Sequence, residues 1–218
     1  MNFGTAQEKP LITAPERLAR RVLNAQGLKS RWLMTSVGRI HALDGVGQGP
    51  LPPIVMLHGL SANAVSYAGL LRRFVPHSRR VIAPDMPGHG FSDVPAMGLG
   101  REPMLAGLNE TLDRLIDEPA IVIGNSMGGL GAIRYALSRP NKVRGLVLIS
   151  PGGAPMPEGE LQQFLDTFRI NRYTDALNFV DRMFSRSPRV LRHALAMGVR
   201  ERFAHPELRR LIDDIRAE

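Results

Sequence analysis

Short apolar runs alternate with amphipathic stretches through the middle of this 218-residue chain. The apolar runs predict four strands, at residues 54–57, 81–83, 120–123 and 143–149. The amphipathic stretches between them predict three helices, at residues 67–74, 104–116 and 130–137. Strands that are apolar throughout and separated by helices are typical of a parallel sheet covered on both faces. The expected fold class is therefore α/β, with a mostly parallel, doubly wound sheet.

The two ends of the chain carry different patterns. Thr13-Ala-Pro-Glu16 is a capping-box pattern that predicts a helix beginning there, and Gly27 is suited to end it. Residues 31–43 predict a hairpin with a turn near Gly38, and a loop rich in glycine and proline follows over residues 45–53. Residues 158–217 predict several short amphipathic helices and no strand. The expected organisation is an N-terminal helical segment over 1–29, a core over 30–152 and a helical part over 153–218.

Composition narrows the classes of protein that the chain can belong to. The absence of cysteine excludes disulfides, thiolate metal sites and a cysteine nucleophile. No apolar run approaches 18 residues and no secretion signal is evident, so we expect a cytoplasmic protein with no membrane partner. The net charge is +8, and residues 1–39 hold seven Lys or Arg less two Glu, which is +5. No nucleic-acid motif accompanies this charge, so an arginine-rich solvated surface is expected rather than a nucleic-acid partner.

One stretch combines a strand, a sharp turn and a helix around a single hydroxyl. Gly124-Asn-Ser-Met-Gly128 fits the pattern G-x-S-x-G, and it lies where a strand pattern gives way to a helix pattern. Such a turn lifts the serine above the sheet edge and forces Ser126 into a strained backbone conformation. The helix that follows points N–H groups and the positive end of its dipole at the serine. We therefore interpret Ser126 as a nucleophile, with Asn125 as part of the same turn.

Two further loops follow predicted strands. Leu57-His-Gly-Leu-Ser61 can aim a backbone N–H, that of Leu60, at a developing oxyanion, and the N–H of Met127 would be the second donor. His58 and Gly59 are interpreted as supporting this loop, with the His58 ring holding it rather than transferring protons. The loop from Pro84 to Ser92 is interpreted as a rigid structural turn whose Asp85 and Ser92 side chains bond to the backbone.

These motifs together resemble the α/β-hydrolase fold superfamily. The resemblance rests on His58-Gly59, on Asp85-Met-Pro-Gly-His-Gly-Phe-Ser92 and on Gly124-Asn-Ser-Met-Gly-Gly129, which occur in the family's order and spacing. It is specific over residues 54–152, and it implies that the helical part is a lid. Serine at position 126 argues against the epoxide hydrolases and haloalkane dehalogenases of this fold, which use aspartate there.

Within the superfamily, Gly124-Asn-Ser-Met-Gly-Gly129 and Ser150-Pro-Gly-Gly153 most resemble the carbon–carbon bond hydrolases of aromatic meta-cleavage pathways, and esterases share much of this pattern. The resemblance implies a serine hydrolase that cleaves an ester or a carbon–carbon bond of a small hydrophobic substrate, without a cofactor or a metal. The alternative is a non-catalytic or truncated relative that binds a ligand. The lid would set the substrate, and its apolar residues could line a pocket or simply pack together: Phe164, Phe168, Phe179, Met183, Phe184 and Met197.

The base that should activate Ser126 is not evident in the sequence. The resemblance implies a catalytic acid and a histidine later in the chain than the lid, and we expect both beyond Glu218. His193 and His205 fall in predicted lid helices, and His89 is the first candidate for a substitute base. Without further strands, the strand at 143–149 would be an apolar edge. We therefore expect a fragment of a longer protein, or a homo-oligomer or a second chain that completes the sheet.

Overall fold

The computed structural model describes residues 12–183 and 189–217. The chain forms two compact units, Met1–Ala154 and Pro155–Glu218. The first unit contains, in order, α1 (Ala14–Ala25), β1 (Lys29–Thr35), β2 (Gly38–Val46), β3 (Ile54–Leu57), the 3₁₀ turn η1 (Ala64–Tyr67), α2 (Ala68–Phe74), β4 (Arg80–Pro84), α3 (Arg101–Leu115), β5 (Ala120–Asn125), α4 (Met127–Ser138), η2 (Pro140–Lys142) and β6 (Val143–Ile149). The second contains α5 (Glu158–Asp166), α6 (Tyr173–Met183), α7 (Arg189–Phe203) and α8 (Pro206–Ala217).

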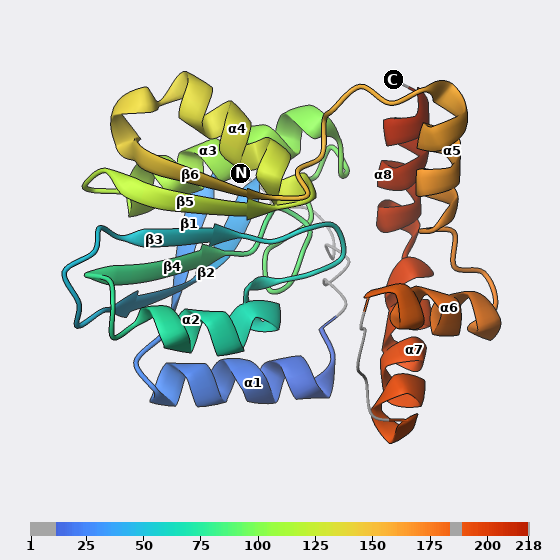
Figure 1. Ribbon diagram of the computed structural model, residues 1–218, viewed down its shortest axis with the longest axis horizontal. Helices are drawn as coiled ribbons and strands as arrows, with labels where there is room; N and C mark the ends of the chain where they lie inside the picture. The colour runs from blue at the N-terminus through green and yellow to red at the C-terminus, as the bar shows by residue number, and fades with distance from the viewer. Residues whose placement is uncertain (1–11, 184–188, 218) are drawn as a thin grey trace, which may run out of the picture. The chain divides into compact units, whose positions relative to one another are not determined.

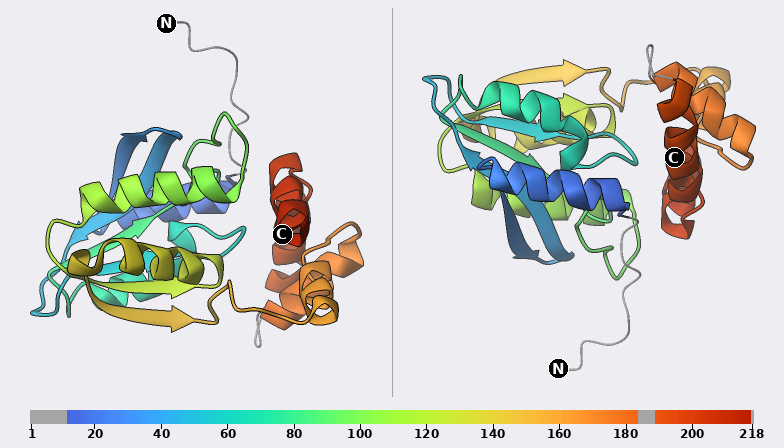
Figure 2. Two further views of the ribbon diagram at one scale, coloured as in Figure 1. Left: turned by 90° about the horizontal axis from the view of Figure 1, so that it is seen from above. Right: turned by 90° about the horizontal axis from the view of Figure 1, so that it is seen from below.

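The first unit is a six-stranded mixed sheet with helices on both faces. The strand order is β1-β2-β4-β3-β5-β6. The first three strands in this order pair antiparallel, and β4, β3, β5 and β6 run parallel. Helices α1 and α2 cover one face of the sheet and α3 and α4 cover the other (Figures 1 and 2). The predicted α/β class with a mostly parallel, doubly wound sheet is confirmed.

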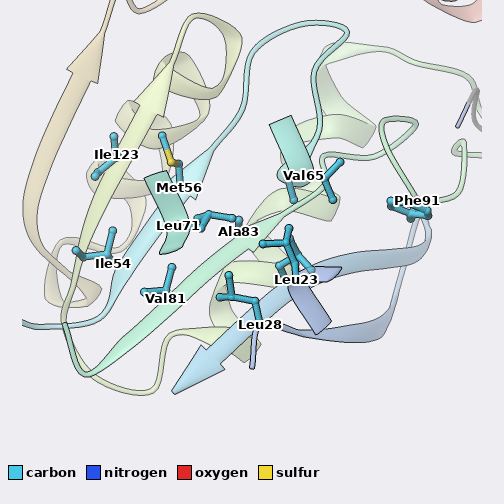
Figure 3. Close-up of a cluster of buried hydrophobic side chains, with 12 residues drawn as sticks. Leu23, Leu28, Ile54, Met56, Val65, Leu71, Val81, Ala83, Phe91 and Ile123 are labelled. Atoms are coloured by element: carbon cyan, nitrogen blue, oxygen red, sulfur yellow. The ribbon is translucent and has the colours of Figure 1, made fainter. Parts of the chain in front are cut away.

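The core on the α1 and α2 face explains why the predicted strands are apolar. Leu23 of α1 and Leu71 of α2 pack against strand residues that include Ile54, Met56 and Val81, all of them buried (Figure 3). All four residues of β3 are buried, because this strand is central in the sheet and is covered on both faces. Burial of a side chain of this size contributes about 1.5–3 kcal/mol to folding, so the short central strands carry much of the stability.

Helix α1 begins as the capping pattern predicts. The Thr13 hydroxyl accepts a hydrogen bond from the Glu16 N–H, and the Glu16 carboxylate accepts one from the Thr13 N–H at 2.8 Å. Beyond the helix, Gly27 adopts a φ of +99°, a conformation that costs glycine little because it has no Cβ. The predicted helix and both of its end signals are confirmed.

Strand β2 is longer than the sequence predicts. The glycines from residue 45 indicated a loop, yet the strand continues to Val46, because Gly45 and Val46 pair with Val81 and Arg80 of β4. A Cβ at Gly45 would lie 2.8 Å from a methyl carbon of Leu28, so a larger residue would require the Leu28 side chain to shift. Long-range pairing therefore overrides the local loop signal.

Strand β6 is an edge of the sheet with apolar residues on both of its faces. It pairs with β5 alone among the strands of the described residues. Its last four residues are 39–45% exposed, a large fraction for apolar side chains: Leu146, Val147, Leu148 and Ile149. The sequence-based expectation of an apolar edge at this strand is confirmed.

Within the described residues, the regular elements of the second unit are all helices. Three aromatic rings pack against one another within it: the Phe168 ring centroid lies 5.9 Å from that of Phe179, and Phe179 lies 5.3 Å from Phe203. Met183 and Met197 are exposed, and Phe184 lies outside the described residues. Across residues 12–183 and 189–217, the helices are too short or too polar for any of them to cross a bilayer.

Candidate active site

Ser126 occupies a strained turn between a strand and a helix. Strand β5 ends at Asn125 and α4 begins at Met127, so Ser126 alone makes the change of direction. Its φ of 51° and ψ of −119° lie in a region that residues with a Cβ rarely adopt. Such a conformation costs about 1–3 kcal/mol and persists only where the surroundings enforce it. The predicted backbone strain is confirmed.

Glycines flank Ser126 because the backbone on either side is too close for a side chain. A Cβ at Gly124 would lie 2.5 Å from the carbonyl oxygen of Gly128. A Cβ at Gly128 would lie 2.4 Å from the carbonyl oxygen of Leu57 and 2.5 Å from that of His58. The start of α4 is therefore pressed against the end of β3, and any other residue at either position would push the serine out of place.

Backbone hydrogen bonds enforce the strained turn. The Ser126 N–H donates to the carbonyl of Ile149 at the end of β6, at 3.0 Å. The Ser126 carbonyl accepts from the N–H of Gly129 at 2.8 Å and from that of Gly152 at 2.9 Å. The loop that follows β6 thus contributes to the site. This role was not predicted from the sequence, in which Ser150-Pro-Gly-Gly153 contributed only to the family resemblance.

The loop after β3 lies beside Ser126 because β3 and β5 are parallel neighbours, with Leu57 opposite Gly124. The His58 ring is buried and holds this loop in two places. Its Nδ1 donates to the Gly59 carbonyl at 2.9 Å, and its Nε2 accepts from the Met86 N–H at 2.9 Å. Because a backbone N–H can only donate, Nε2 is the acceptor in the bond from Met86. These bonds agree with the structural role that the sequence predicted for His58.

Two backbone N–H groups lie near Ser126, one in the loop after β3 and one at the start of α4. Within the residues that the structure describes, neither the Leu60 N–H nor the Met127 N–H donates to a protein atom. Met127 is the first residue of α4, where helix N–H groups have no partner in the helix. A Cβ at Gly59 would lie 3.2 Å from the Cβ of Ser126, so the two loops are in close contact. Backbone N–H groups without a protein acceptor are the donors that can bind a negatively charged oxygen.

The loop after β4 is a structural turn, as predicted. Asp85 is fully buried, and its carboxylate accepts from the Ala64 N–H at 2.6 Å and the Phe91 N–H at 2.9 Å. Burial raises the pKa of this carboxyl, but the hydrogen bond and the charge interaction with His41, followed by the charge interaction with His58 and the bond from the Ala64 backbone, outweigh burial and hold the pKa below its ordinary value. The Ser92 hydroxyl donates to the Asp85 carbonyl at 2.9 Å.

A serine, a histidine and an aspartate are hydrogen-bonded in sequence, but the serine is not Ser126. His41 Nδ1 lies 2.8 Å from the Asp85 carboxylate, and His41 Nε2 lies 3.0 Å from the Ser30 hydroxyl. Ser30 stands on the regular strand β1, and its hydroxyl also contacts the side chains of Asn24 and Arg20. These contacts tie the hairpin to the core. This chain of bonds is not visible in the sequence, because its members lie up to 55 residues apart.

None of the histidines of the first unit is hydrogen-bonded to the Ser126 hydroxyl, and within the described residues no bond to this hydroxyl is recorded. His89 Nδ1 donates to the Pro87 carbonyl at 3.0 Å in its own loop. His77 lies beside Gly49, ahead of β3, and so at the opposite end of the strands from Ser126. Over the same residues, no group of three His, Asp or Glu is placed to hold a metal ion.

The site residues predicted from the sequence therefore lie together at the carboxyl ends of β3 and β5. A serine in a strained turn between a strand and a helix, beside a loop that follows a neighbouring strand, is typical of the α/β-hydrolase class of protein. Residues 52–202 match the family described as alpha/beta hydrolase fold, and the chain belongs to that family.

Two relatives show which proteins the sequence is similar to. The chain is 35% identical over 137 residues to 2-hydroxymuconate semialdehyde hydrolase of Pseudomonas sp. (strain CF600), covering 55% of this chain and 48% of the relative. It is 37% identical over 132 residues to 2-hydroxy-6-oxo-6-phenylhexa-2,4-dienoate hydrolase of Burkholderia cepacia, covering 55% and 44%. The chain thus spans about half the length of the curated relatives it matches.

Solved structures show the same fold. A membrane phospholipase A superposes with a TM-score of 0.74 at 21% identity, covering 94% of this chain and 66% of that one. Naproxen esterase from Bacillus subtilis superposes with a TM-score of 0.63 at 20% identity, covering 87% and 69%. At these identities the likeness establishes the fold alone.

Proposed function

We propose that Ser126 is the nucleophile of a serine hydrolase that cleaves an ester or a carbon–carbon bond of a small hydrophobic substrate. The observation that carries this proposal is the strained backbone of Ser126, with its φ of 51°, at the junction of β5 and α4. Strain of this kind is costly and gathers at functional sites. The names of the two hydrolase relatives support the reaction class.

The proposed chemistry follows from the groups around Ser126. Its Oγ attacks a substrate carbonyl carbon while a base takes the hydroxyl proton, and the carbonyl oxygen becomes negatively charged. The N–H groups of Leu60 and Met127 stabilise that oxygen, and the N-terminus of α4 adds the positive end of the helix dipole. The tetrahedral species then expels the leaving group, an alcohol from an ester or a carbon that takes up a proton, and water releases the acyl group.

On this proposal the base is a histidine that lies beyond Glu218, together with the acid that orients it. The histidines of the first unit support the assignment, because His41 and His58 use both ring nitrogens in other bonds. A serine hydroxyl without a base is a weak nucleophile at neutral pH.

A second candidate function is binding without turnover. The observation that favours it is that, within the described residues, no base is hydrogen-bonded to the Ser126 hydroxyl. A binding protein would use the loops around Ser126 to hold a small ligand. Such a protein gains nothing from the backbone strain at Ser126, and so we place this candidate second.

The test is covalent labelling of the native protein, purified at its natural length, with a fluorophosphonate probe. We expect Ser126 to be labelled and Ser126→Ala to abolish labelling. Ser30→Ala is the matched control, because Ser30 is the serine that the structure hydrogen-bonds to a histidine. This control should keep its label.

Three outcomes separate the alternatives. Labelling that persists in Ser126→Ala and disappears in Ser30→Ala would move the nucleophile to Ser30. An unlabelled wild type that still binds a small apolar ligand near Ser126 would support the second candidate. With Ser126 labelled, turnover should fall by several orders of magnitude in Ser126→Ala, because the nucleophile and its base act as a unit.

A further inference from the structure

Tyr67 contacts both loops that carry the proposed oxyanion donors. Its hydroxyl lies 3.1 Å from Asn125 Oδ1, and Asn125 directly precedes Ser126. The Gly59 backbone, which directly precedes Leu60, lies near the same hydroxyl and lowers its pKa. Tyr67, at the end of η1, is thus bonded to the turn after β5 through Asn125, and a Cβ at Gly59 in the loop after β3 would lie 3.1 Å from the same Asn125 Oδ1.

The direction of each hydrogen bond in this group is fixed by chemistry. Asn125 Nδ2 lies 3.1 Å from the Ile149 carbonyl, which can only accept, so the amide oxygen of Asn125 faces Tyr67. The Tyr67 hydroxyl must therefore donate to that oxygen. Burial raises the pKa of Tyr67, and the Gly59 backbone opposes this rise, as expected for an N–H that faces the phenol oxygen.

Tyr67 is itself held on a rigid support. The turn η1 is capped by Asn63, whose side chain accepts from the Ser66 N–H at 3.1 Å. The Ala64 N–H is anchored on the buried Asp85 carboxylate at 2.6 Å. A hydroxyl that is fixed in this way can set the separation of the two loops that it contacts.

We propose that Tyr67 is a positioning residue of the oxyanion site, whose hydroxyl holds the Leu60 and Met127 N–H groups at the separation that a tetrahedral oxyanion requires. The inference rests on the proposed function, because it concerns the same site. Tyr67 acts through Gly59 and Asn125 and does not touch the reacting atoms. Its hydroxyl should therefore matter most in the transition state, when the charge on the oxygen is largest.

The variant that tests this role is Tyr67→Phe in the native protein, assayed with an activated ester. We expect kcat to fall about tenfold with KM within about twofold, because one neutral hydrogen bond is lost and the donors remain present but less well placed. The affinity for a boronic acid that mimics the tetrahedral species should fall by a similar factor. Removal of a donor itself costs about 10²–10³ in kcat, which sets the upper limit.

Tyr135→Phe is the matched control. This variant removes a tyrosine hydroxyl that bonds to Asp113, between α4 and α3, at 3.1 Å. The melting temperatures of both variants show whether each protein is folded in the assay. A second check is Asn125→Ala: if Tyr67 acts through Asn125, the double variant should lose little more kcat than Asn125→Ala alone.

Each result decides one point. Provided that the wild type is active, three results would overturn the role of Tyr67. They are a Tyr67→Phe enzyme with wild-type kcat, an effect of Tyr67→Phe that is confined to KM, and an equal loss of kcat in Tyr135→Phe. A wild type that neither turns over an ester nor labels at Ser126 means that the proposed function has failed, and the role of Tyr67 falls with it.

Discussion

Gly128→Ala should destabilise the first unit strongly, although alanine is normally the better residue in a helix. An added Cβ would lie 2.4 Å from the Leu57 carbonyl oxygen, and a tolerable contact begins near 3.0 Å, so α4 and β3 must separate by about 0.6 Å. Both partners are backbone, and β3 is fixed by its pairing with β4 and β5. The cost should therefore reach about 3 kcal/mol, the upper end for overpacked sites.

The matched control is Gly69→Ala, which changes the same residue at the second position of another helix, α2. No atom lies within 4 Å of a Cβ placed at Gly69, so this substitution should stabilise by about 0.5–1 kcal/mol. Urea unfolding can be followed by the fluorescence of Trp32, the single tryptophan, which lies on β1 in the first unit. With an m-value of about 2 kcal/mol/M, Gly128→Ala should lower the midpoint by about 1.5 M. Equal midpoints for the two variants would refute the reasoning from close backbone contact.

Three further results are expected. Asp85→Asn should lower the free energy of unfolding at neutral pH by about 2–4 kcal/mol. Because the pKa of Asp85 is lower in the folded state, this difference in unfolding free energy should persist at pH values above the ordinary aspartate pKa of about 3.9 and shrink as the pH falls below it. A difference that stays constant in acid would contradict a lowered pKa at Asp85. The 218-residue chain alone should bind a hydrophobic dye and self-associate through β6, and Val147→Lys should weaken both effects, as dye fluorescence and light scattering would show. That chain should also hydrolyse activated esters poorly, with a rate no more than about 10³–10⁴-fold above that of the reaction in water. A turnover near 10 s⁻¹ would mean that one of its own histidines acts as the base, and His89 would be the first to test.

The elements that the sequence predicted best are those whose signals are local. The capping box at Thr13 and the glycines around Ser126 act on backbone a few residues away, so their spacing is visible in the sequence. The strained turn follows from such spacing, because Gly124 and Gly128 are required by the same sharp change of direction. The loop at His58 could be predicted for the same reason, since it directly follows a strand.

The features that the sequence did not reveal depend on contacts between distant residues. Tyr67 and Asn125 are 58 residues apart, and only the sheet order places η1 beside the end of β5. Ser30, His41 and Asp85 meet because β1, β2 and β4 are neighbours. The extension of β2 through Gly45 likewise depends on its partner strand, which a pattern along one segment cannot represent.

The positive φ at Ser126 makes this a position where stability and chemistry favour different amino acids. Glycine adopts such a backbone without penalty, so Ser126→Gly would release about 1–3 kcal/mol of strain. Substitutions that stabilise a strained functional position are commonly paid for in activity. If a lineage lost its need for the hydroxyl, mutation and drift would then favour glycine at this position over many generations. Glycine or serine at position 126 in close relatives would therefore record whether the hydroxyl has remained under selection.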